Sequence, residues 1–200
     1  MDKKFHAGVT RFFLFGLIVL SSCAHKEKKL TDLVDPMIGT DGTGHTFPGA
    51  TVPFGMVQLS PSNDFKGWDW CSGYHYQDSV LKGFAHTHIS GAGLTGLGDF
   101  LFMPTTGNPQ LLPGSEANPE TGYRSRFSHE REHASAGYYS VHLDDYDIQV
   151  ELTAGERSGY HRYTFQRTGS GNVIIDPTHS VGESVMDAGV EFLSDREVRG

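Results

Sequence analysis

The stretch YSVHLDDYDIQVEL, residues 139–152, is the clearest indication of fold class in this sequence. Apolar and polar residues alternate on both sides of a central acidic segment, Asp144 to Asp147. Alternation with a period of two is typical of a strand with one buried face, and Asp-rich segments favour turns. The stretch therefore predicts an antiparallel hairpin. The residues expected on its buried face are Tyr139, Val141, Leu143, Ile148, Val150 and Leu152.

Similar patterns occur along the rest of the chain. His161, Tyr163 and Phe165 share one face of a further predicted strand, and 173–175 is a short apolar run. Earlier strands are predicted at 51–59, 81–89 and 100–103, the last ended by Pro104. The 25 Gly and 9 Pro residues among 200 supply turns, and we find no amphipathic helix of three turns. These features predict an all-β fold, an antiparallel β-sandwich with long loops between its early strands.

Charge limits the classes of partner. The formal net charge is −8, and nucleic-acid binding requires a basic face, so we expect no nucleic-acid partner. Two cysteines are too few for a disulfide-rich scaffold.

The N-terminus predicts export and lipid anchoring. Residues 1–22 combine a basic end with a nine-residue apolar run at 12–20, which is too short to span a bilayer but suits a signal peptide. The following Leu20-Ser21-Ser22-Cys23 resembles the lipobox of bacterial lipoproteins, in which the cysteine becomes the lipid-bearing terminus. We expect lipidation of Cys23, a tether over 23–32 and a cell-envelope location, periplasmic or attached to the outer membrane. Removing 1–22, with its one acidic and three basic residues, changes the net charge from −8 to −10.

The remaining residues, 33–200, are predicted to form one β-sandwich domain. The sequence stops at 197–200 without a terminating signal. We therefore expect this domain to be incomplete at its C-terminal end.

Residues 129–133 match a zinc-hydrolase motif in sequence, but their context does not favour the helix that the motif requires. His129-Glu130-Arg131-Glu132-His133 satisfies H-E-x-x-H, but that motif requires a helix that places both imidazoles on one face. No apolar stripe is available to bury such a helix, so a polar strand-and-turn segment is the favoured interpretation.

Histidines also gather beside glycine-rich loops. His86 and His88 are predicted on the same side of a strand, with Asp99 after the next loop. A metal site is one interpretation, and hydrogen bonding in a polar cleft is the favoured one, because further ligands are not evident. We expect one polar cleft that also holds His45 and His75.

The segment 67–76 is the densest aromatic patch and contains both tryptophans, Trp68 and Trp70. An indole face suits the C–H face of a pyranose ring, and Asp69 can accept hydrogen bonds from sugar hydroxyls. The alternative interpretation is an aromatic cluster in the core of the sandwich.

Several segments, taken in order, resemble the N-terminal region of glycoside hydrolase family 92, the bacterial exo-acting α-mannosidases. The resemblance runs from about Leu33 to at least Phe165. The segments that carry it are 35–40 (DPMIGT), 47–50 (FPGA), 53–58 (PFGMVQ), 72–76 (SGYHY), 83–91 (GFAHTHISG), 137–141 (GYYSV), 151–154 (ELTA) and 157–165 (RSGYHRYTF).

This resemblance implies a two-domain enzyme in which an N-terminal β-sandwich packs on a C-terminal (α/α)6 barrel that is absent from this chain. It implies a Ca²⁺-dependent, inverting exo-α-mannosidase, similar to α-1,2-mannosidases, that releases mannose from glycans. In the family the catalytic carboxylates and the Ca²⁺ ligands belong mainly to the C-terminal domain. We therefore expect no catalytic residue and no metal ligand here, and no activity from this portion alone.

What the resemblance leaves for this portion is one wall of the sugar pocket. The residues expected to bind the mannose-containing glycan are Phe47, Pro48, Gly49, Trp68, Asp69, Trp70, His86, His88, Ser90 and Gly91. The loop 91–99 is looser and more apolar than the family's usual form, which leaves the linkage preference open. Two alternatives stay open: a lipid-anchored carbohydrate-binding sandwich without catalysis, and, less favoured, a zinc hydrolase using His129 and His133.

Overall fold

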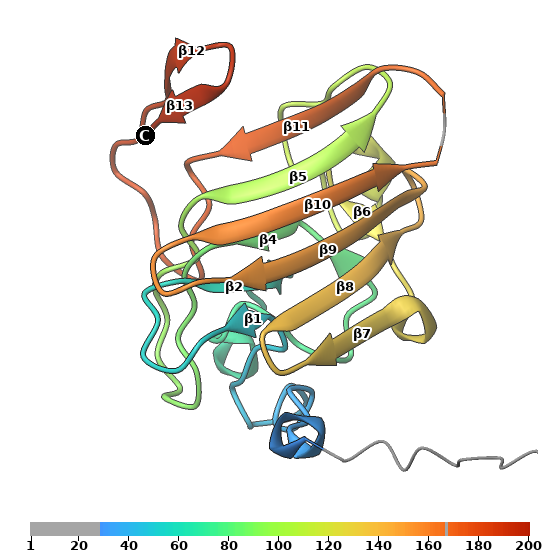
Figure 1. Ribbon diagram of the computed structural model, residues 1–200. Coiled ribbons are helices and arrows are strands. Elements are labelled where there is room, and N and C mark those ends of the chain that lie inside the picture. The colour runs from blue at the N-terminus through green and yellow to red at the C-terminus, as the bar shows by residue number, and fades with distance from the viewer. Residues whose placement is uncertain (1–28, 167) are drawn as a thin grey trace, which may run out of the picture.

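The computed structural model describes residues 29–166 and 168–200 (Figure 1). The predicted signal peptide, the lipidation residue Cys23 and most of the tether lie outside the described residues. Within the described ranges strands dominate, and the helical segments are short 3-10 turns: η1 (Leu30–Leu33), η2 (Trp68–Trp70), η3 (Pro119–Thr121) and η4 (His129–Arg131). No helix in these ranges has the length and apolar character needed to span a bilayer.

The hairpin predicted at 139–152 belongs to a four-stranded antiparallel sheet. Its strands are β7 (Glu132–Ser135), β8 (Tyr138–Leu143), β9 (Ile148–Ala154) and β10 (Gly159–Phe165), in the order β10-β9-β8-β7. Val141 lies opposite Val150 and Leu143 opposite Ile148, as a hairpin with one buried face requires. The prediction of this hairpin and of the strand that follows it is confirmed.

The second large sheet has five antiparallel strands. They are β1 (Ala50–Thr51), β2 (Gln58–Ser62), β4 (Gly83–Ala85), β5 (Leu101–Thr106) and β11 (Gly171–Asp176), in the order β1-β2-β4-β5-β11. Two small ladders complete the described strands: β3 (Val80–Leu81) with β6 (Ser125–Arg126), and β12 (Glu191–Ser194) with β13 (Glu197–Arg199). The β12–β13 hairpin stands apart from the two large sheets in Figure 1.

The two large sheets bury their inner faces against each other. One core cluster joins Leu59, Phe84 and Met103 of the five-stranded sheet to Val141 and Val150 of the four-stranded sheet. Each such side chain contributes about 1.5–3 kcal/mol when fully buried. The predicted antiparallel β-sandwich is confirmed.

The strand predicted at 51–59 is wrong in its middle. Pro53 and Phe54 form a turn instead, closed by a hydrogen bond from the Gly55 amide to the Val52 carbonyl (2.9 Å). The turn separates β1 from β2 and places 52–57 at the surface, as the cyan loop between these strands in Figure 1. Proline removes an amide donor, which explains why the apolar run does not continue as one strand.

Two further strand boundaries differ from prediction. The strand expected over 81–89 ends at Ala85, so His86 and His88 lie beyond it. The strand expected to stop before Pro104 instead runs through it to Thr106. Beyond Phe102, β5 pairs only with β11, and this edge position tolerates the missing proline amide.

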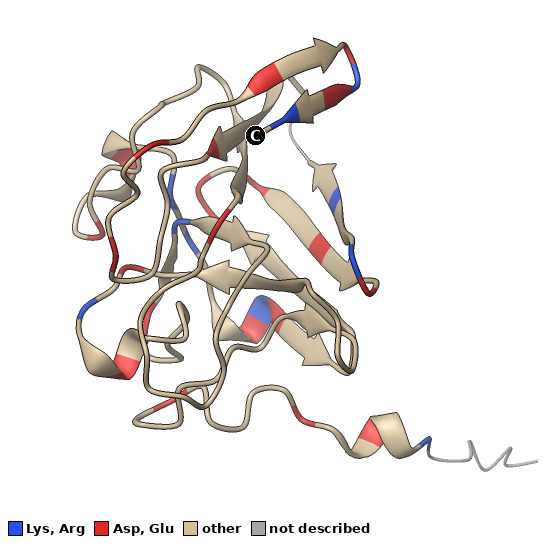
Figure 2. Cartoon of the chain, turned by 90° about the vertical axis from the view of Figure 1, so that its left-hand side faces the viewer, with Lys and Arg blue, Asp and Glu red and all other residues tan. Residues whose placement is uncertain are grey.

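Charged residues are distributed over the surface. In Figure 2 the Lys and Arg segments are separated from one another, with Asp and Glu segments between them. One buried ion pair joins Arg124 to Asp64, and the Arg124 side chain is almost fully covered. The arginine beside Asp64 holds the pKa of that carboxyl below its usual value, against the opposing effect of burial.

Candidate functional site

The structure separates the ten predicted sugar-binding residues into four places. Trp68, Asp69 and Gly91 gather around His45. Phe47, Gly49 and Ser90 line an apolar groove. Pro48 is buried, and His88 packs beside Phe47. Trp70 turns to another neighbourhood, and His86 lies in a separate pocket.

The Trp68 cluster, by which we mean His45, Trp68, Asp69, Gly91 and Gly93, joins η2 to two glycine-rich loops. The Trp68 ring meets the His45 ring edge-on, with centroids 4.1 Å apart. Its Nε1 donates to the Gly93 carbonyl (3.0 Å), and the Gly91 amide donates to the His45 carbonyl (2.6 Å). Although its polar edge is tied down, 60% of Trp68 is exposed. The cluster therefore presents a fixed aromatic face to solvent.

His45 is the chemically unusual member of this cluster. Only 6% of it is exposed, and its Nε2 atom has no hydrogen-bond partner. That atom is 3.9 Å from Oδ1 of Asp69, whose side chain is 41% exposed. A buried polar atom without a partner costs about 1–3 kcal/mol. This nitrogen therefore has an unused hydrogen-bonding capacity in the structure, and the Asp69 carboxylate beside it is partly exposed.

The backbone around His45 explains how the imidazole is held. His45 has φ +54°, in the left-handed region that ordinary residues seldom occupy. The preceding residue must be glycine, since a Cβ on Gly44 would lie 2.2 Å from the Gly39 carbonyl oxygen. Local sequence thus fixes a strained loop beneath Trp68, and strain of this kind is common at functional sites.

The groove beside this cluster has a volume of about 790 Å³ and runs along Phe47, Gly49 and Ser90. Gly49 is required for packing: a Cβ there would lie 2.2 Å from the Leu59 carbonyl oxygen of β2. Ser90 is exposed, and Pro48 is buried. Of the predicted sugar-binding residues, Phe47 and Ser90 are therefore the ones whose side chains line this groove.

His88 supports this groove from inside the protein. It is 4% exposed, its Nδ1 donates to the Gln58 carbonyl (2.8 Å), and its Nε2 accepts from the Ser62 hydroxyl (3.1 Å). Burial lowers the pKa of the His88 imidazole to about 4, so it is neutral at physiological pH. Its ring lies 5.3 Å from that of Phe47. Both ring nitrogens of His88 thus have protein partners, and its ring packs beside Phe47.

Trp70 does not share the wall with Trp68. Its ring stacks on His75 with centroids 4.3 Å apart, and its Nε1 donates to Asp78 (2.8 Å). The Lys66 ammonium lies 5.4 Å from the same ring. The indole nitrogen and the ring of Trp70 thus have protein partners, as the alternative interpretation of this patch, a structural aromatic cluster, expects.

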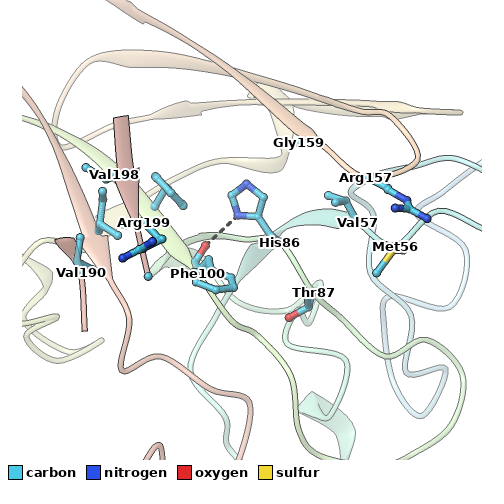
Figure 3. Close-up of a pocket in the computed structure, with 13 residues that line it drawn as sticks. Met56, Val57, His86, Thr87, Phe100, Arg157, Gly159, Val190, Val198 and Arg199 are labelled. Atoms are coloured by element: carbon cyan, nitrogen blue, oxygen red, sulfur yellow. Dashed lines mark hydrogen bonds between the residues drawn. The ribbon is translucent and has the colours of Figure 1, made fainter. Parts of the chain in front are cut away.

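His86 lies in a pocket of about 510 Å³, which we call the His86 pocket. In Figure 3 its imidazole lies between Val190, Val198 and Arg199 on one side and Met56, Val57 and Arg157 on the other. Its Nδ1 donates to the Phe100 carbonyl (2.9 Å), as the dashed line shows.

A chain of hydrogen bonds leads from His86 into the four-stranded sheet. His86 Nε2 lies 3.2 Å from His161 Nε2, and the Tyr163 hydroxyl lies 2.7 Å from His161 Nδ1. Because the Phe100 carbonyl can only accept, one arrangement satisfies all donors: Tyr163 donates to His161, and His161 donates to His86. Burial lowers the pKa of His86, and it lowers that of His161 to about 3. Both rings are therefore neutral and fully engaged.

The expectation of a single cleft holding four imidazoles is wrong. His45 contacts Trp68, His75 stacks on Trp70, His88 packs beside Phe47, and His86 pairs with His161. The reason is that 83–85 is the whole of β4, so His86 and His88 follow irregular backbone and diverge.

The H-E-x-x-H segment does not form the helix that the zinc motif requires. Only His129–Arg131 is helical, and Glu132 already belongs to β7. Glu132 is buried and accepts hydrogen bonds from the hydroxyls of Tyr74 and Tyr139, and it lies 2.5 Å from His129. His133 is exposed on β7, so the two imidazoles do not converge.

Over the described ranges, no group of three or more His, Cys, Asp or Glu residues is arranged to hold a metal ion. These residues therefore do not fit a Ca²⁺ site by themselves. Cys71 is a buried free thiol.

His45 is not among the sugar-binding residues that the sequence predicts. The signal that points to it is its position after Gly44 in a loop with two nearby glycines, which marks an unusual backbone. That signal identifies the loop, whereas the unpartnered nitrogen is visible only in three dimensions.

Comparison with known proteins agrees with this architecture. The family model "Glycosyl hydrolase family 92 N-terminal domain" matches residues 33–200. The family GH92 α-mannosidase BT3965 of Bacteroides thetaiotaomicron is 48% identical, with a TM-score of 0.76 over 78% of this chain and 21% of that chain. Its complex with mannoimidazole matches with a TM-score of 0.74, over 77% of this chain and 20% of that chain.

More distant relatives extend the same pattern. The family GH92 inverting mannosidase BT2199 of the same organism is 31% identical, with a TM-score of 0.59 over 74% of this chain and 20% of that chain. An uncharacterized secreted glycosidase of Arthroderma benhamiae is 26% identical in an alignment of 194 positions that covers 90% of this chain and 24% of that protein. The chain thus spans about a fifth to a quarter of the length of these relatives. The match over residues 33–200, together with the sandwich and its loops, shows that the chain belongs to glycosyl hydrolase family 92, in the part that forms the N-terminal domain.

Proposed function

We propose that this chain is the N-terminal part of an exo-α-mannosidase that releases mannose from glycans, and that it supplies one wall of the sugar pocket. The observation that carries the proposal is the Trp68 cluster, where an exposed indole face stands beside a buried imidazole nitrogen without a partner. The 48% identity to an α-mannosidase solved with mannoimidazole supports mannose as the sugar.

The residues of this wall bind and orient the sugar. The Trp68 face stacks on the C–H face of a mannose ring, and this contact excludes water from that side. The His45 Nε2 atom and the Asp69 carboxylate hydrogen-bond to sugar hydroxyls, which fixes the rotation of the ring. Phe47 and Ser90 contact the part of the glycan that occupies the groove. We extend the expected set of sugar-binding residues by His45 and remove His88, His86 and Trp70 from direct contact.

Cleavage requires two further groups that we do not assign to the described residues. An inverting glycosidase uses a general acid at the leaving oxygen and a general base that activates water, with about 6.5–9.5 Å between the carboxyl groups. The relative BT2199 is an inverting mannosidase, which supports inversion. We place both carboxylates in the remaining polypeptide of the complete enzyme, the part expected to form an (α/α)6 barrel.

We also propose that the complete enzyme depends on Ca²⁺ held by ligands outside the described residues. When bound, such an ion would supply a hard Lewis acid for sugar hydroxyls. The residues of this chain then act by stacking and hydrogen bonding alone.

Export and anchoring form part of the proposal. Lipidation of Cys23 would hold the enzyme at the cell envelope, with the segment 23–32 as a tether. The secreted relative from Arthroderma benhamiae supports a location outside the cytoplasm. Replacement of the lipidation residue by Cys23→Ala should release the protein from the membrane fraction.

The experiment that tests the function uses the complete enzyme and α-linked mannobioses of each linkage. We expect release of mannose, fastest from the α-1,2 disaccharide, with the β-anomer as the first product by proton NMR and with activity lost on chelation and restored by Ca²⁺. A complete protein that binds α-mannosides without cleaving them would instead support the second candidate, a lipid-anchored carbohydrate-binding sandwich.

A further inference from the structure

Trp68 is oriented by a carbonyl of the glycine-rich loop 91–98. Its Nε1 atom donates to the Gly93 carbonyl (3.0 Å), and Gly93 packs against the indole, because a Cβ there would lie 3.1 Å from Nε1. The loop contains four glycines, and each of them has positive φ: Gly91, Gly93, Gly96 and Gly98. Glycine loses more conformational freedom on ordering than any other residue, so such a loop does not hold one shape by itself. Contacts from outside the loop must therefore fix the position of the Gly93 carbonyl.

The segment 179–183 supplies these contacts, although it lies 81 to 88 positions away in the sequence. The Gly96 amide donates to the Val181 carbonyl (2.8 Å), and the Val181 amide donates to the Leu97 carbonyl (2.9 Å). The Ser180 hydroxyl also donates to the Leu97 carbonyl (3.2 Å). These bonds pair the two backbones in the manner of a short β-ladder.

His179 and Glu183 fix the two ends of this contact. His179 is 4% exposed, and its Nδ1 donates to the Gly98 carbonyl (2.6 Å). Burial lowers the pKa of His179 to about 4, so the ring is neutral at physiological pH, and its single hydrogen lies on Nδ1 because a carbonyl only accepts. At the other end the Thr95 hydroxyl donates to the exposed Glu183 carboxylate (2.7 Å). The loop is thus held on both sides, close to the carbonyl that accepts from Trp68.

We propose that the segment 179–183 is a positioning element for Trp68, with His179 as its principal residue. By fixing the loop, His179 sets the position of the Gly93 carbonyl, and that carbonyl selects the indole orientation that faces the sugar. The inference rests on the proposed function, in which Trp68 stacks on a mannose ring. An indole that is 60% exposed has other rotamers open to it once its acceptor moves, and ordering it again would weaken binding. His179 thus acts on the reaction through Trp68.

The first test follows the loop and Trp68 in the complete enzyme. Amide hydrogen exchange is measured by mass spectrometry for peptides of the loop, and Trp68 is followed by fluorine NMR after labelling with 5-fluorotryptophan, its resonance being identified by its loss in Trp68→Phe. We expect His179→Leu to speed exchange in the loop about tenfold, the value of one hydrogen bond, and to shift or broaden the Trp68 resonance. His179→Asn should stay close to the unmodified enzyme, because its side-chain amide can donate in place of Nδ1. Unchanged loop exchange or an unchanged Trp68 resonance in His179→Leu would overturn the proposal.

The second test asks whether His179 acts through Trp68. In the unmodified background His179→Leu should lower kcat/KM on α-mannosides about tenfold, whereas in the Trp68→Ala background it should change kcat/KM less than about twofold. A merely structural role gives the same loss in both backgrounds, and that result would contradict the proposal. If Trp68→Ala by itself leaves kcat/KM unchanged, the proposed function of this wall fails, while the loop exchange and the Trp68 resonance still decide the positioning role.

A milder pair of variants covers the case in which His179→Leu does not fold. Thr95→Val removes the hydroxyl bonded to Glu183 and keeps the shape of the side chain, so it should lower kcat/KM about threefold and shift the Trp68 resonance. Thr178→Val is the matched control, because it removes a hydroxyl bonded to Asp176 and should leave both readouts unchanged. Equal effects of the two substitutions would overturn the role of the segment.

Discussion

The Trp68 cluster and the His86 pocket both place a histidine beside a glycine-rich loop, yet their hydrogen bonding differs. In the pocket both nitrogens of His86 and of His161 have partners, and both rings are neutral. In the cluster the His45 Nε2 atom has none, although His45 is almost fully buried. Complete satisfaction indicates a structural role, because adding a ligand would break existing bonds. An unpartnered buried atom beside an exposed aromatic face indicates where a ligand is expected.

The largest expected effect separates the two tryptophans of η2. In the complete enzyme Trp68→Ala should lower kcat/KM on α-mannosides about 30-fold or more, because removal of a central aromatic contact costs about 2 kcal/mol or more. Its melting temperature should change little, since Trp68 is mostly exposed.

Trp70→Ala is the matched variant two residues away. It removes the stack on His75 and leaves Asp78 without its indole donor, so it should lower the melting temperature by several degrees. If Trp68→Ala destabilises the enzyme as much as Trp70→Ala does, Trp68 is a packing residue and the comparison fails.

An intermediate effect is expected for His45 and His88, which the sequence predicts in one polar cleft. His45→Asn keeps a residue that tolerates positive φ and removes the free Nε2 atom, so kcat/KM should fall about tenfold, the value of one hydrogen bond of about 1.4 kcal/mol. The melting temperature of His45→Asn should fall less than that of His88→Asn, because His45 Nε2 makes no hydrogen bond that the variant loses. His88→Asn should affect mainly stability. It disrupts the hydrogen bonds to Gln58 and Ser62, so it should lower the melting temperature. Stability loss in both variants to the same extent would remove the distinction between them.

The smallest effect concerns pH. His161 has a folded-state pKa of about 3, below the ordinary value of 6.5, so the unfolded chain binds a proton that the folded chain excludes. Stability from this residue is therefore full above pH 6.5 and falls as the pH decreases toward 3. His161→Asn should be less stable at pH 7, and this deficit should shrink between pH 7 and 4.5. That window lies above the titration of Asp64 and Asp176, whose pKa values are lowered by their hydrogen-bond partners. Parallel stability curves for the two proteins would show that the His86–His161 pair is not held neutral.

Local periodicity makes a strand predictable from its sequence. The alternation at 139–152 predicts β8 and β9 because one face of that hairpin is buried along its whole length. The strand predicted at 51–59 is wrong because Pro53 and Phe54 turn the chain, and the strand predicted over His86 and His88 is wrong because β4 has only three residues. A turn and a strand end are single events in the chain, so no periodic pattern of apolar residues marks their positions.

The division between Trp68 and Trp70 lies beyond sequence reasoning for a similar reason. In a strand, residues two apart share a face, whereas in a 3-10 helix they point in different directions. Trp68 and Trp70 lie in η2, a 3-10 helix of only three residues, which has no periodic pattern in the sequence. The aromatic patch is visible in the sequence, but the sequence does not separate Trp68 from Trp70.

The most direct test of the central claim is a crystal structure of the complete enzyme with mannoimidazole. We predict that the sugar ring lies within van der Waals distance of the Trp68 face, with a hydrogen bond, direct or through one water, to His45 Nε2 or Asp69. A mannoimidazole bound in the catalytic site without contact to the Trp68 cluster, or seated in the His86 pocket, would contradict the assignment of this wall.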